Sequence, residues 1–342
     1  MKKKVTIMDV ARDCGLSKST VAYALNSSAK GKVSLLKREI VKRSAVKLGY
    51  RPNIMAQSLR SGRTNSIGLL WSLAGPHDSI GVVRNISIRL MRKGYACHMA
   101  DSLSDPKIIK QCLKDFCCRN VDGVIIQLEK ELVNDKEIYN LLREISNVVI
   151  VMPEPVDSEF DSLILDRTHA TREIVNHFAA SGRKKITFMT GASSIREPAF
   201  IEQIKACNLA CYDDSIIHLK ERRNENDKEQ GLGDIFLYTI QNTLDKKIPF
   251  DALLVSCDEG AVAIINYLEK NGYKVPEDIA VSGFNNSAVA PHLRIPLASV
   301  DRRNQDVAES VTKMLLNRIK NSNLPLQREL LEMKFIHRES AG

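Results

Sequence analysis

From residue 66 onward, short runs of β-branched and apolar residues alternate with longer amphipathic segments. This alternation is typical of parallel sheets built from repeated strand, helix and strand units. The expected strands are SIGLLW, YACHMA, GVIIQL, NVVIV, SLILD, KITFMTG, SIIHL, ALLVS, DIAVSGF and LASV. The helical segments between them include residues 82–93, 106–118, 168–181, 258–271 and 304–319. Because one open sheet seldom holds ten strands, we expect two α/β lobes rather than one.

The first 63 residues are far more basic than the rest of the chain. Nine Lys and six Arg stand against three acidic residues there, which gives this segment a net charge of +12. Since the whole chain carries +9, residues 64–342 carry −3. A positive charge confined to one end of a chain is typical of a domain that binds a polyanion, most often nucleic acid.

Composition and motifs exclude several other classes of protein. With 44% hydrophobic and 27% charged residues, the 342-residue chain is an ordinary globular protein of two to three domains. No apolar run approaches the roughly 20 residues of a membrane helix, and MKKKVTIMDVARDCGL lacks the apolar region of a signal peptide. The eight cysteines show no zinc-binding spacing, so we expect reduced thiols, no metal and a cytoplasmic location.

The basic segment has the pattern of two short helices joined by a glycine turn. Thr6 and Asp9 form a capping box that predicts a helix start. Gly15 stands where a helix ends in a left-handed residue, and Ser17 is a second N-cap. An apolar stripe lies between them, made of Ile7, Val10, Ala11 and Cys14. This is the arrangement that places a second helix in the major groove of DNA.

A third helix is predicted after the N-cap Ser34. Its expected buried side consists of Leu36, Ile40, Val41, Ala45 and Leu48. Its opposite side is basic and consists of Lys37, Arg38, Lys42, Arg43 and Lys47. Taken alone, these cations fit a solvated helix face equally well. Their position beside the two-helix unit favours nucleic-acid binding.

Two stretches of this region, VTIMDVARDCGLSKSTVAYALN and KVSLLKREIVKRSAVKLGYRPNIMAQSLRSGRTNSIGLL, resemble the start of bacterial lactose-repressor-type (LacI/GalR) transcription factors. The matching residues are Thr6, Asp9-Val10-Ala11, Gly15, Ser17, Thr20-Val21, Leu25-Asn26, Val33-Ser34, Gly49 to Asn53, Ala56, Leu59 and Ile67-Gly68. A weaker, collinear likeness continues to residue 342. The resemblance implies a sequence-specific DNA-binding regulator, a repressor by family habit, that binds a near-palindromic operator in double-stranded DNA as a homodimer.

By position, the resemblance implies that Lys18, Ser19 and Tyr23 read bases. The expected contacts to the DNA backbone are Thr6, Ser17, Thr20, Asn26, Lys30 and Lys32. Relatives often carry Arg at the position of Tyr23. Since Arg reads guanine with two hydrogen bonds and a phenol offers one hydroxyl, we expect a different half-site here. The alternative is that Tyr23 packs onto the third helix.

Residues 51–64 match the hinge of the family, after a helix-turn-helix domain at residues 1–50. Relatives fold this segment into a helix only on operator DNA and insert a leucine from each subunit into the minor groove. Leu59 matches that leucine, Asn53 is a cap candidate, and Ala56 supplies a small surface for helix pairing. The alternative is that Leu59 makes only a minor dimer contact.

For residues 65–342 the resemblance implies the two-lobed type I periplasmic-binding-protein fold with parallel sheets. Lobe one is expected at about 65–163 and 295–322, and lobe two at about 164–294 and 323–342. The chain would cross between the lobes near residues 162–166, 291–296 and 321–326. Family members bind an effector between the lobes, and pockets in open α/β sheets lie at the carboxyl ends of strands.

Effector-binding positions of the family fall on Arg196 and Asp258, with Trp71 nearby as a third candidate. A guanidinium and a carboxylate together suit a polyhydroxylated ligand such as a sugar. The alternatives are a salt bridge between the two residues, or Asp258 as a helix cap. Ala199, Cys257, MPEP at 152–155 and Asp166-Arg167 depart from the family pattern, so a nucleobase, another metabolite or no effector stays open.

Two rival functions have little support in the sequence. An enzyme is disfavoured because the chain lacks G-x-G-x-x-G, Walker A, G-x-S-x-G and HExxH motifs. A ligand-independent architectural DNA-binding protein is the second rival. We expect no enzyme activity and no cofactor beyond a small-molecule effector, and a dimer because no leucine heptads follow the last strand.

Overall fold

The structure is a computed structural model, and it describes residues 5–25, 32–51, 62–73, 78–129, 132, 134–155, 157–191, 194–220 and 231–342. The chain divides into two compact units, Met1–Thr64 and Asn65–Gly342. The smaller unit holds the basic segment, and the larger unit holds the alternating strands and helices.

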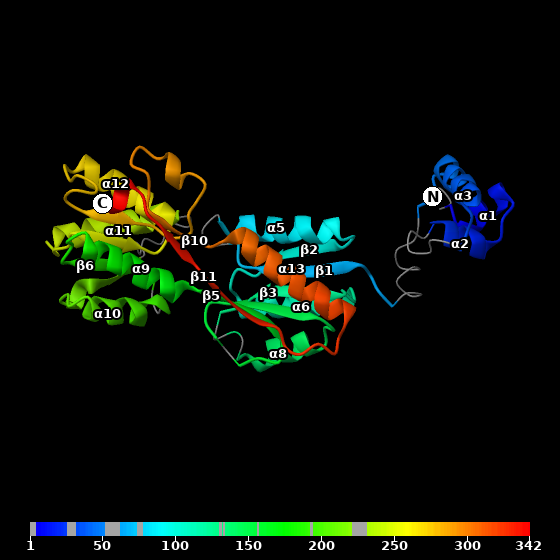
Figure 1. Cartoon of the computed structure of the whole chain (residues 1–342), viewed down its shortest axis with the longest axis horizontal. Coiled ribbons are helices and arrows are strands. Elements are labelled where there is room, and N and C mark those ends of the chain that lie inside the picture. Colours follow the sequence, from blue (N-terminus) through cyan, green and yellow to red (C-terminus); the bar gives the residue numbers. More distant parts are fainter. Residues whose placement is uncertain are drawn as a thin grey trace. The chain divides into compact units, whose positions relative to one another are not determined.

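The smaller unit consists of α1 (Ile7–Cys14), α2 (Lys18–Leu25) and α3 (Leu35–Leu48) (Figure 1). Gly15 adopts a left-handed φ of 63° and ends α1, which allows the tight turn into α2. The three helices share a small core of Val10, Ala11, Val21, Ala24, Val41 and Ala45. A core of this size leaves most of each helix surface exposed.

The buried side of α3 is narrower than its sequence suggests. Leu36 is 73% exposed and Ile40 is also exposed, so the prediction that both face the core is wrong. Val41, Ser44 and Ala45 are the buried residues of this helix. They face α1 and α2, whereas Leu36 and Ile40 lie on another side of the helix, because 3.6 residues make one turn.

Lobe one is built on a six-stranded parallel sheet in the order β11-β5-β4-β3-β1-β2. The strands are β1 (Ser66–Trp71), β2 (Ala96–Asp101), β3 (Gly123–Gln127), β4 (Val148–Met152), β5 (Asp161–Asp166) and β11 (Arg328–Glu332). On one face lie α5 (Asp78–Arg92) and α13 (Asn304–Lys320), and on the other lie α6 (Pro106–Cys118) and α8 (Lys136–Arg143) (Figure 1). The buried strands make a three-layer α/β/α core.

Lobe two repeats this architecture on a smaller sheet in the order β7-β6-β8-β9. Its strands are β6 (Ile186–Thr190), β7 (Ile216–His218), β8 (Ala252–Val255) and β9 (Ala280–Ser282), with the antiparallel pair β10 (Ser299–Asp301) and β12 (Lys334–Ile336) beside them. Its helices are α9 (Arg167–Ala180) and α10 (Arg196–Ala206) on one face, and α11 (Leu232–Asp245) and α12 (Asp258–Lys270) on the other. Single 3-10 turns occur at η1 (Asp213–Ser215), η2 (Ala290–His292) and η3 (Glu339–Ala341).

The ten strands expected from the sequence all form, and the two-lobed α/β fold is confirmed. The chain crosses between the lobes after β5, between β10 and α13, and between β11 and β12 (Figure 1). The first crossing follows Asp166, so residues 164–166 lie in lobe one rather than in lobe two, which was expected to begin at about 164. The other two follow several residues after the expected 291–296 and 321–326, because β10 pairs with β12 in lobe two and β11 pairs with β5 in lobe one.

Candidate functional site

The outer face of α2 carries the three residues expected to read DNA bases. Lys18 and Ser19 are exposed, and Tyr23 is 43% exposed and absent from the core shared by the three helices. The Lys32 ammonium lies 5.1 Å from the centre of the Tyr23 ring. The ring is therefore not part of the buried core, and its packing onto the third helix stays an alternative to base reading. Lys32 and Tyr23 together present one positive, hydrogen-bonding edge.

Hydroxyl groups line the first turns of α1 and α2. The Thr6 hydroxyl and amide donate to the Asp9 carboxylate at 2.7 and 2.9 Å, as expected for a capping box. Ser17 Oγ accepts from the amide of Thr20 at 3.2 Å and lies 2.8 Å from the Thr20 hydroxyl. These groups sit at helix N-termini, where amides and hydroxyls favour an anion such as a DNA phosphate.

The basic side of α3 is held against α1 by one cluster. Asp13 accepts from the Ser44 hydroxyl at 2.7 Å and from the Lys47 ammonium at 2.8 Å. Both hydrogen bonds lower the pKa of Asp13 below its ordinary value, and the one from Lys47 has the larger effect. Lys37, Lys42 and Arg43 are exposed on the same helix.

Five of the residues expected to contact DNA lie outside the described residues. They are Asn26 and Lys30 in the headpiece, and Asn53, Ala56 and Leu59 in the hinge. Their expected roles stay predictions.

The larger unit contains a cavity of about 330 Å³ at the carboxyl ends of strands from both lobes. Lobe one contributes Ser72, Ser79, Ser104, Gln127 and Glu129. Lobe two and the crossing segments contribute Arg167, Thr190, Gly191, Arg196, Leu219, Leu232, Phe236, Ser256, Cys257, Phe284, Asn285 and Arg302. The volume lies at the small end of the range for small-molecule sites, roughly 300–1,000 Å³.

Arg196, at the start of α10, is the predicted effector residue that lines this cavity. Its guanidinium carbon lies 4.4 Å from the ring centre of Phe284 and 5.1 Å from that of Phe188. Nε donates weakly to Ser194 Oγ at 3.4 Å, whereas Nη1 is buried and has no hydrogen-bond partner among the described residues. Burial lowers the pKa of Arg196 to about 9, and the nearby positive charge of Arg167 acts in the same direction. The neighbouring carboxylate of Glu197 offsets only part of this effect, and Nη1 still lacks an acceptor among the described residues.

Two further buried polar atoms on the cavity wall have no partner among the residues that the structure describes. They are Gln127 Oε1 from lobe one and Asn285 Nδ2 from lobe two. Most buried polar groups in native proteins are hydrogen-bonded, so three such atoms around one cavity indicate a missing ligand or water. An acceptor for Arg196 and Asn285 and a donor for Gln127 would satisfy all three.

The expectation that Asp258 binds the effector disagrees with the geometry. Asp258 is 1% exposed and does not line the cavity. Its two carboxylate oxygens accept from the Ser287 amide and the Ser299 hydroxyl, both at 2.5 Å. A Cβ on Gly283 would lie 2.3 Å from the same carboxylate, so the backbone approaches Asp258 closely. The carboxylate joins loops of lobe two, and Cys257 rather than Asp258 caps α12.

Trp71 is also not where a cavity residue is expected to lie. It is buried at the end of β1 and belongs to the core cluster beneath α5. It does not line the cavity, whereas the next residue, Ser72, does. Strand alternation explains this difference, because successive side chains point to opposite faces of a sheet.

Sequence reasoning missed Gln127, Glu129, Asn285 and Arg302 as cavity residues, and noted Arg167 only as a departure from the family pattern. The sequence did contain a signal for these cavity residues, because each of the five lies at or shortly after the carboxyl end of a predicted strand. No group of His, Cys, Asp and Glu suited to a metal occurs in the described part of the chain. None of its described helices has the length and apolar character to cross a membrane.

Two family models match this chain. Residues 6–53 match bacterial regulatory proteins of the lacI family, and residues 175–341 match a periplasmic binding protein-like domain. The regulator CelR of Thermobifida fusca is 24% identical over 99% of both chains, and RegA of Clostridium saccharobutylicum is 27% identical over 98% of both.

A solved structure of the lac repressor dimer with operator and the anti-inducer ONPF has the same fold. It aligns with a TM-score of 0.83 and 20% identity over 99% of both chains. A CelR–cellobiose complex aligns with a TM-score of 0.68 and 21% identity over 98% of this chain and all of that one. These matches confirm the family resemblance: the chain belongs to the lacI family of bacterial regulatory proteins and is a DNA-binding transcription regulator.

Proposed function

We propose that the protein is a repressor that binds a near-palindromic operator as a homodimer and responds to a small molecule in the cavity between its lobes. The observation that carries the effector part is the set of three unpartnered buried atoms around one cavity, contributed by Gln127, Arg196 and Asn285. A ligand that pairs with all three contacts both lobes at once. Its binding free energy then depends on the angle between the lobes.

The DNA-binding part of the proposal rests on the exposed face of α2. Lys18, Ser19 and Tyr23 are proposed to contact bases, and Thr6, Ser17, Thr20 and Lys32 to contact phosphates, together with Asn26 and Lys30. The net charge of +12 on residues 1–63 supports an affinity that falls steeply with salt, because phosphate contacts release counterions.

Coupling between the two parts is proposed to pass through the hinge at residues 51–64. Movement of the lobes would shift the two hinges of a dimer and so change the seating of Leu59 in the minor groove. Asn53 would cap each hinge helix, and Ala56 would let the two helices approach closely. If Leu59→Ala kept both the operator affinity and the DNA bend, this wedge role would be wrong.

The homodimer is proposed to use the face formed by α5 and the edge strand β2. The apolar side chains Ile80, Met91 and Met99 are exposed there, and β2 has a free edge in the lobe-one sheet. Exposed apolar groups beside an edge strand favour association with a second chain. Sedimentation of a Met91→Asp variant tests this surface, because a charge in the interface would shift the protein towards monomer.

Selection of bound DNA by the purified protein, with and without a metabolite library, tests the whole proposal. The expected result is one palindromic site whose recovery changes with one class of metabolite. Specific DNA binding with no response to any metabolite would favour the architectural alternative. Turnover of a metabolite without DNA binding would favour an enzyme. The proposed location is the bacterial cytoplasm, with the protein on the nucleoid when it is bound to DNA.

A further inference from the structure

The charge of the cavity is strongly unbalanced. Arg167, Arg196 and Arg302 line it, and Glu129 supplies the one carboxylate among the lining residues that the structure describes. Arg302 is buried and interacts with other protein groups, whereas Arg196 has a buried guanidinium nitrogen without a partner among the described residues. A neutral sugar would leave the charges of Arg196 and Arg167 without an anionic partner in a partly desolvated space, which is unfavourable.

Arg167 adds to the imbalance. It begins α9, where Asp166 acts as the N-cap and accepts from the amides of Thr168 and His169 at 2.9 and 3.1 Å. Oδ1 of Asp166 therefore caps the helix. The Arg167 guanidinium has no hydrogen bond or ion pair within the described ranges, and its charge disfavours the charged form of Arg196. An anion between the two guanidinium groups would relieve their repulsion and give Arg196 Nη1 a partner.

The rest of the wall suits hydroxyl groups. Gln127 Oε1 needs a donor and Asn285 Nδ2 needs an acceptor, and a hydroxyl supplies either. Hydroxyl side chains surround them, namely Ser72, Ser79, Ser104, Thr190 and Ser256. Phe236 and Phe284 provide a limited apolar surface. A cavity of about 330 Å³ suits a compact ligand.

We propose that the effector is a monosaccharide that carries one anionic group, a phosphate or a carboxylate, bound by Arg196 and Arg167. Its hydroxyl groups pair with Gln127 and Asn285. This inference rests on the proposed function and narrows it to one chemical class.

Thermal unfolding and isothermal titration of the full chain test this inference. The probes are glucose, fructose and ribose, the monophosphate of each sugar, glucuronate and inorganic phosphate, all at matched ionic strength. We expect at least one anionic sugar to raise the Tm and to bind at least about tenfold more tightly than its neutral parent, because charge-assisted hydrogen bonds are the stronger ones. Comparison of the phosphates with glucuronate shows which anionic group the site prefers.

Matched variants test whether Arg196 and Arg167 cause the tighter binding of the anionic sugar. Arg196→Gln and Arg167→Gln should each weaken binding of the anionic sugar by about tenfold or more, and bring its affinity close to that of the neutral sugar. Arg172→Gln is the control, because Arg172 lies on the same helix as Arg167 but pairs with Glu202 at 3.4 Å and does not line the cavity. This control should bind like the unchanged protein.

Two outcomes would overturn the inference. One is binding of neutral sugars as tight as that of their phosphates or of glucuronate. The other is that none of the anionic probes raises the Tm of the unchanged protein by more than it raises the Tm of the Arg196→Gln variant. Both leave the proposed function intact if the protein still selects an operator whose binding responds to another metabolite. Failure of operator selection itself would instead refute the proposed function.

Discussion

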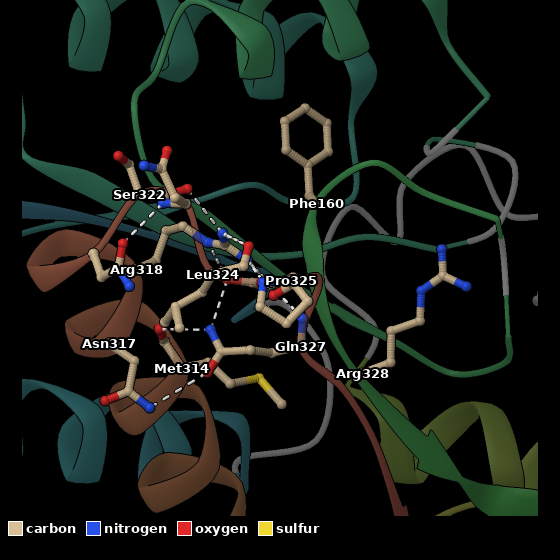
Figure 2. Close-up of polar contacts among 12 residues, drawn as sticks. Phe160, Met314, Asn317, Arg318, Ser322, Leu324, Pro325, Gln327 and Arg328 are labelled. Carbon is tan, nitrogen blue, oxygen red and sulfur yellow. Dashed lines mark hydrogen bonds and ion pairs between the residues drawn. The ribbon is translucent and has the colours of Figure 1, made fainter.

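Arg318 and Asp161 form a two-point ion pair between the end of α13 and the start of β5. Nη2 of Arg318 donates to Oδ1 of Asp161 at 2.7 Å, and Nε donates to Oδ2 at 3.0 Å, while Asp161 is only 1% exposed. The same guanidinium donates to the carbonyl oxygens of Ser322, Leu324 and Pro325 (Figure 2). The pair therefore holds the loop between α13 and β11 onto lobe one.

Gln327 completes this cluster. Its amide nitrogens donate to both oxygens of Asp161, at 2.8 Å from the backbone and 2.9 Å from the side chain, and the side chain also donates to the Met314 carbonyl at 3.0 Å. Because β11 begins at the next residue and pairs with β5, the cluster fixes where the chain starts its return to lobe two.

Arg318→Met should destabilise the larger unit by about 3–5 kcal/mol, since it leaves a buried carboxylate without its cation. Urea unfolding of the full chain measures this. Arg328→Met is the matched control, because Arg328 pairs at 3.1 Å with Asp157, whose side chain is 99% exposed. Arg328→Met should lower the free energy of unfolding by less than about 1 kcal/mol. Equal losses of unfolding free energy in the two variants would show that the buried Arg318–Asp161 pair stabilises the fold no more than the exposed Arg328–Asp157 pair does.

Asp258→Ala should lower stability and leave effector selectivity unchanged. Removal of the carboxylate leaves the Ser287 amide and the Ser299 hydroxyl without their acceptor in a buried region, at a cost of roughly 2–4 kcal/mol. Chemical unfolding and ligand titration of one preparation measure both properties. A variant of normal stability that no longer binds the effector would restore the binding role suggested by the sequence.

The stability of the headpiece should fall in acid because of Asp13. Hydrogen bonds from Lys47 and Ser44 lower its pKa in the folded state, so the stabilisation is complete above the unfolded pKa of about 4 and is lost as pH falls through the folded pKa. Asp13→Asn should therefore increase hydrogen exchange of α1 and α3 near neutral pH, and the difference should disappear in strong acid. Glu39→Gln removes an exposed carboxylate from α3 and serves as the control. A difference that persists at every pH would contradict this role.

Tyr23→Arg should change which base is preferred at one position of each half-site, by about 1–3 kcal/mol, because Arg makes two hydrogen bonds to guanine. Selection of bound DNA from a random pool measures this. Lys32→Gln provides the contrast. This variant should bind all DNA sites more weakly by the same factor, and the salt dependence of its binding should correspond to about one fewer released counterion. Identical half-sites for Tyr23→Arg and the unchanged protein would exclude Tyr23 from base reading.

Local patterns in the sequence determined the elements of this protein. Alternating apolar runs located the ten strands, and the capping pattern of Thr6 with the left-handed Gly15 located the first helix, because these signals depend on neighbouring residues. The role of Arg196, by contrast, was implied by the family resemblance and not by local periodicity.

Tertiary structure decided which polar groups are free to bind and where the chain changes lobe. Asp258 looked equivalent to Arg196 in the sequence, yet Ser287 and Ser299, 29 and 41 residues further on, take up its carboxylate. The second and third crossings depend on the pairing of β10 with β12 and of β11 with β5. The cavity brings Gln127 and Asn285 together from different lobes. Such partners are remote in sequence, so local periodicity carries no information about which hydrogen bonds the fold satisfies and which it leaves open.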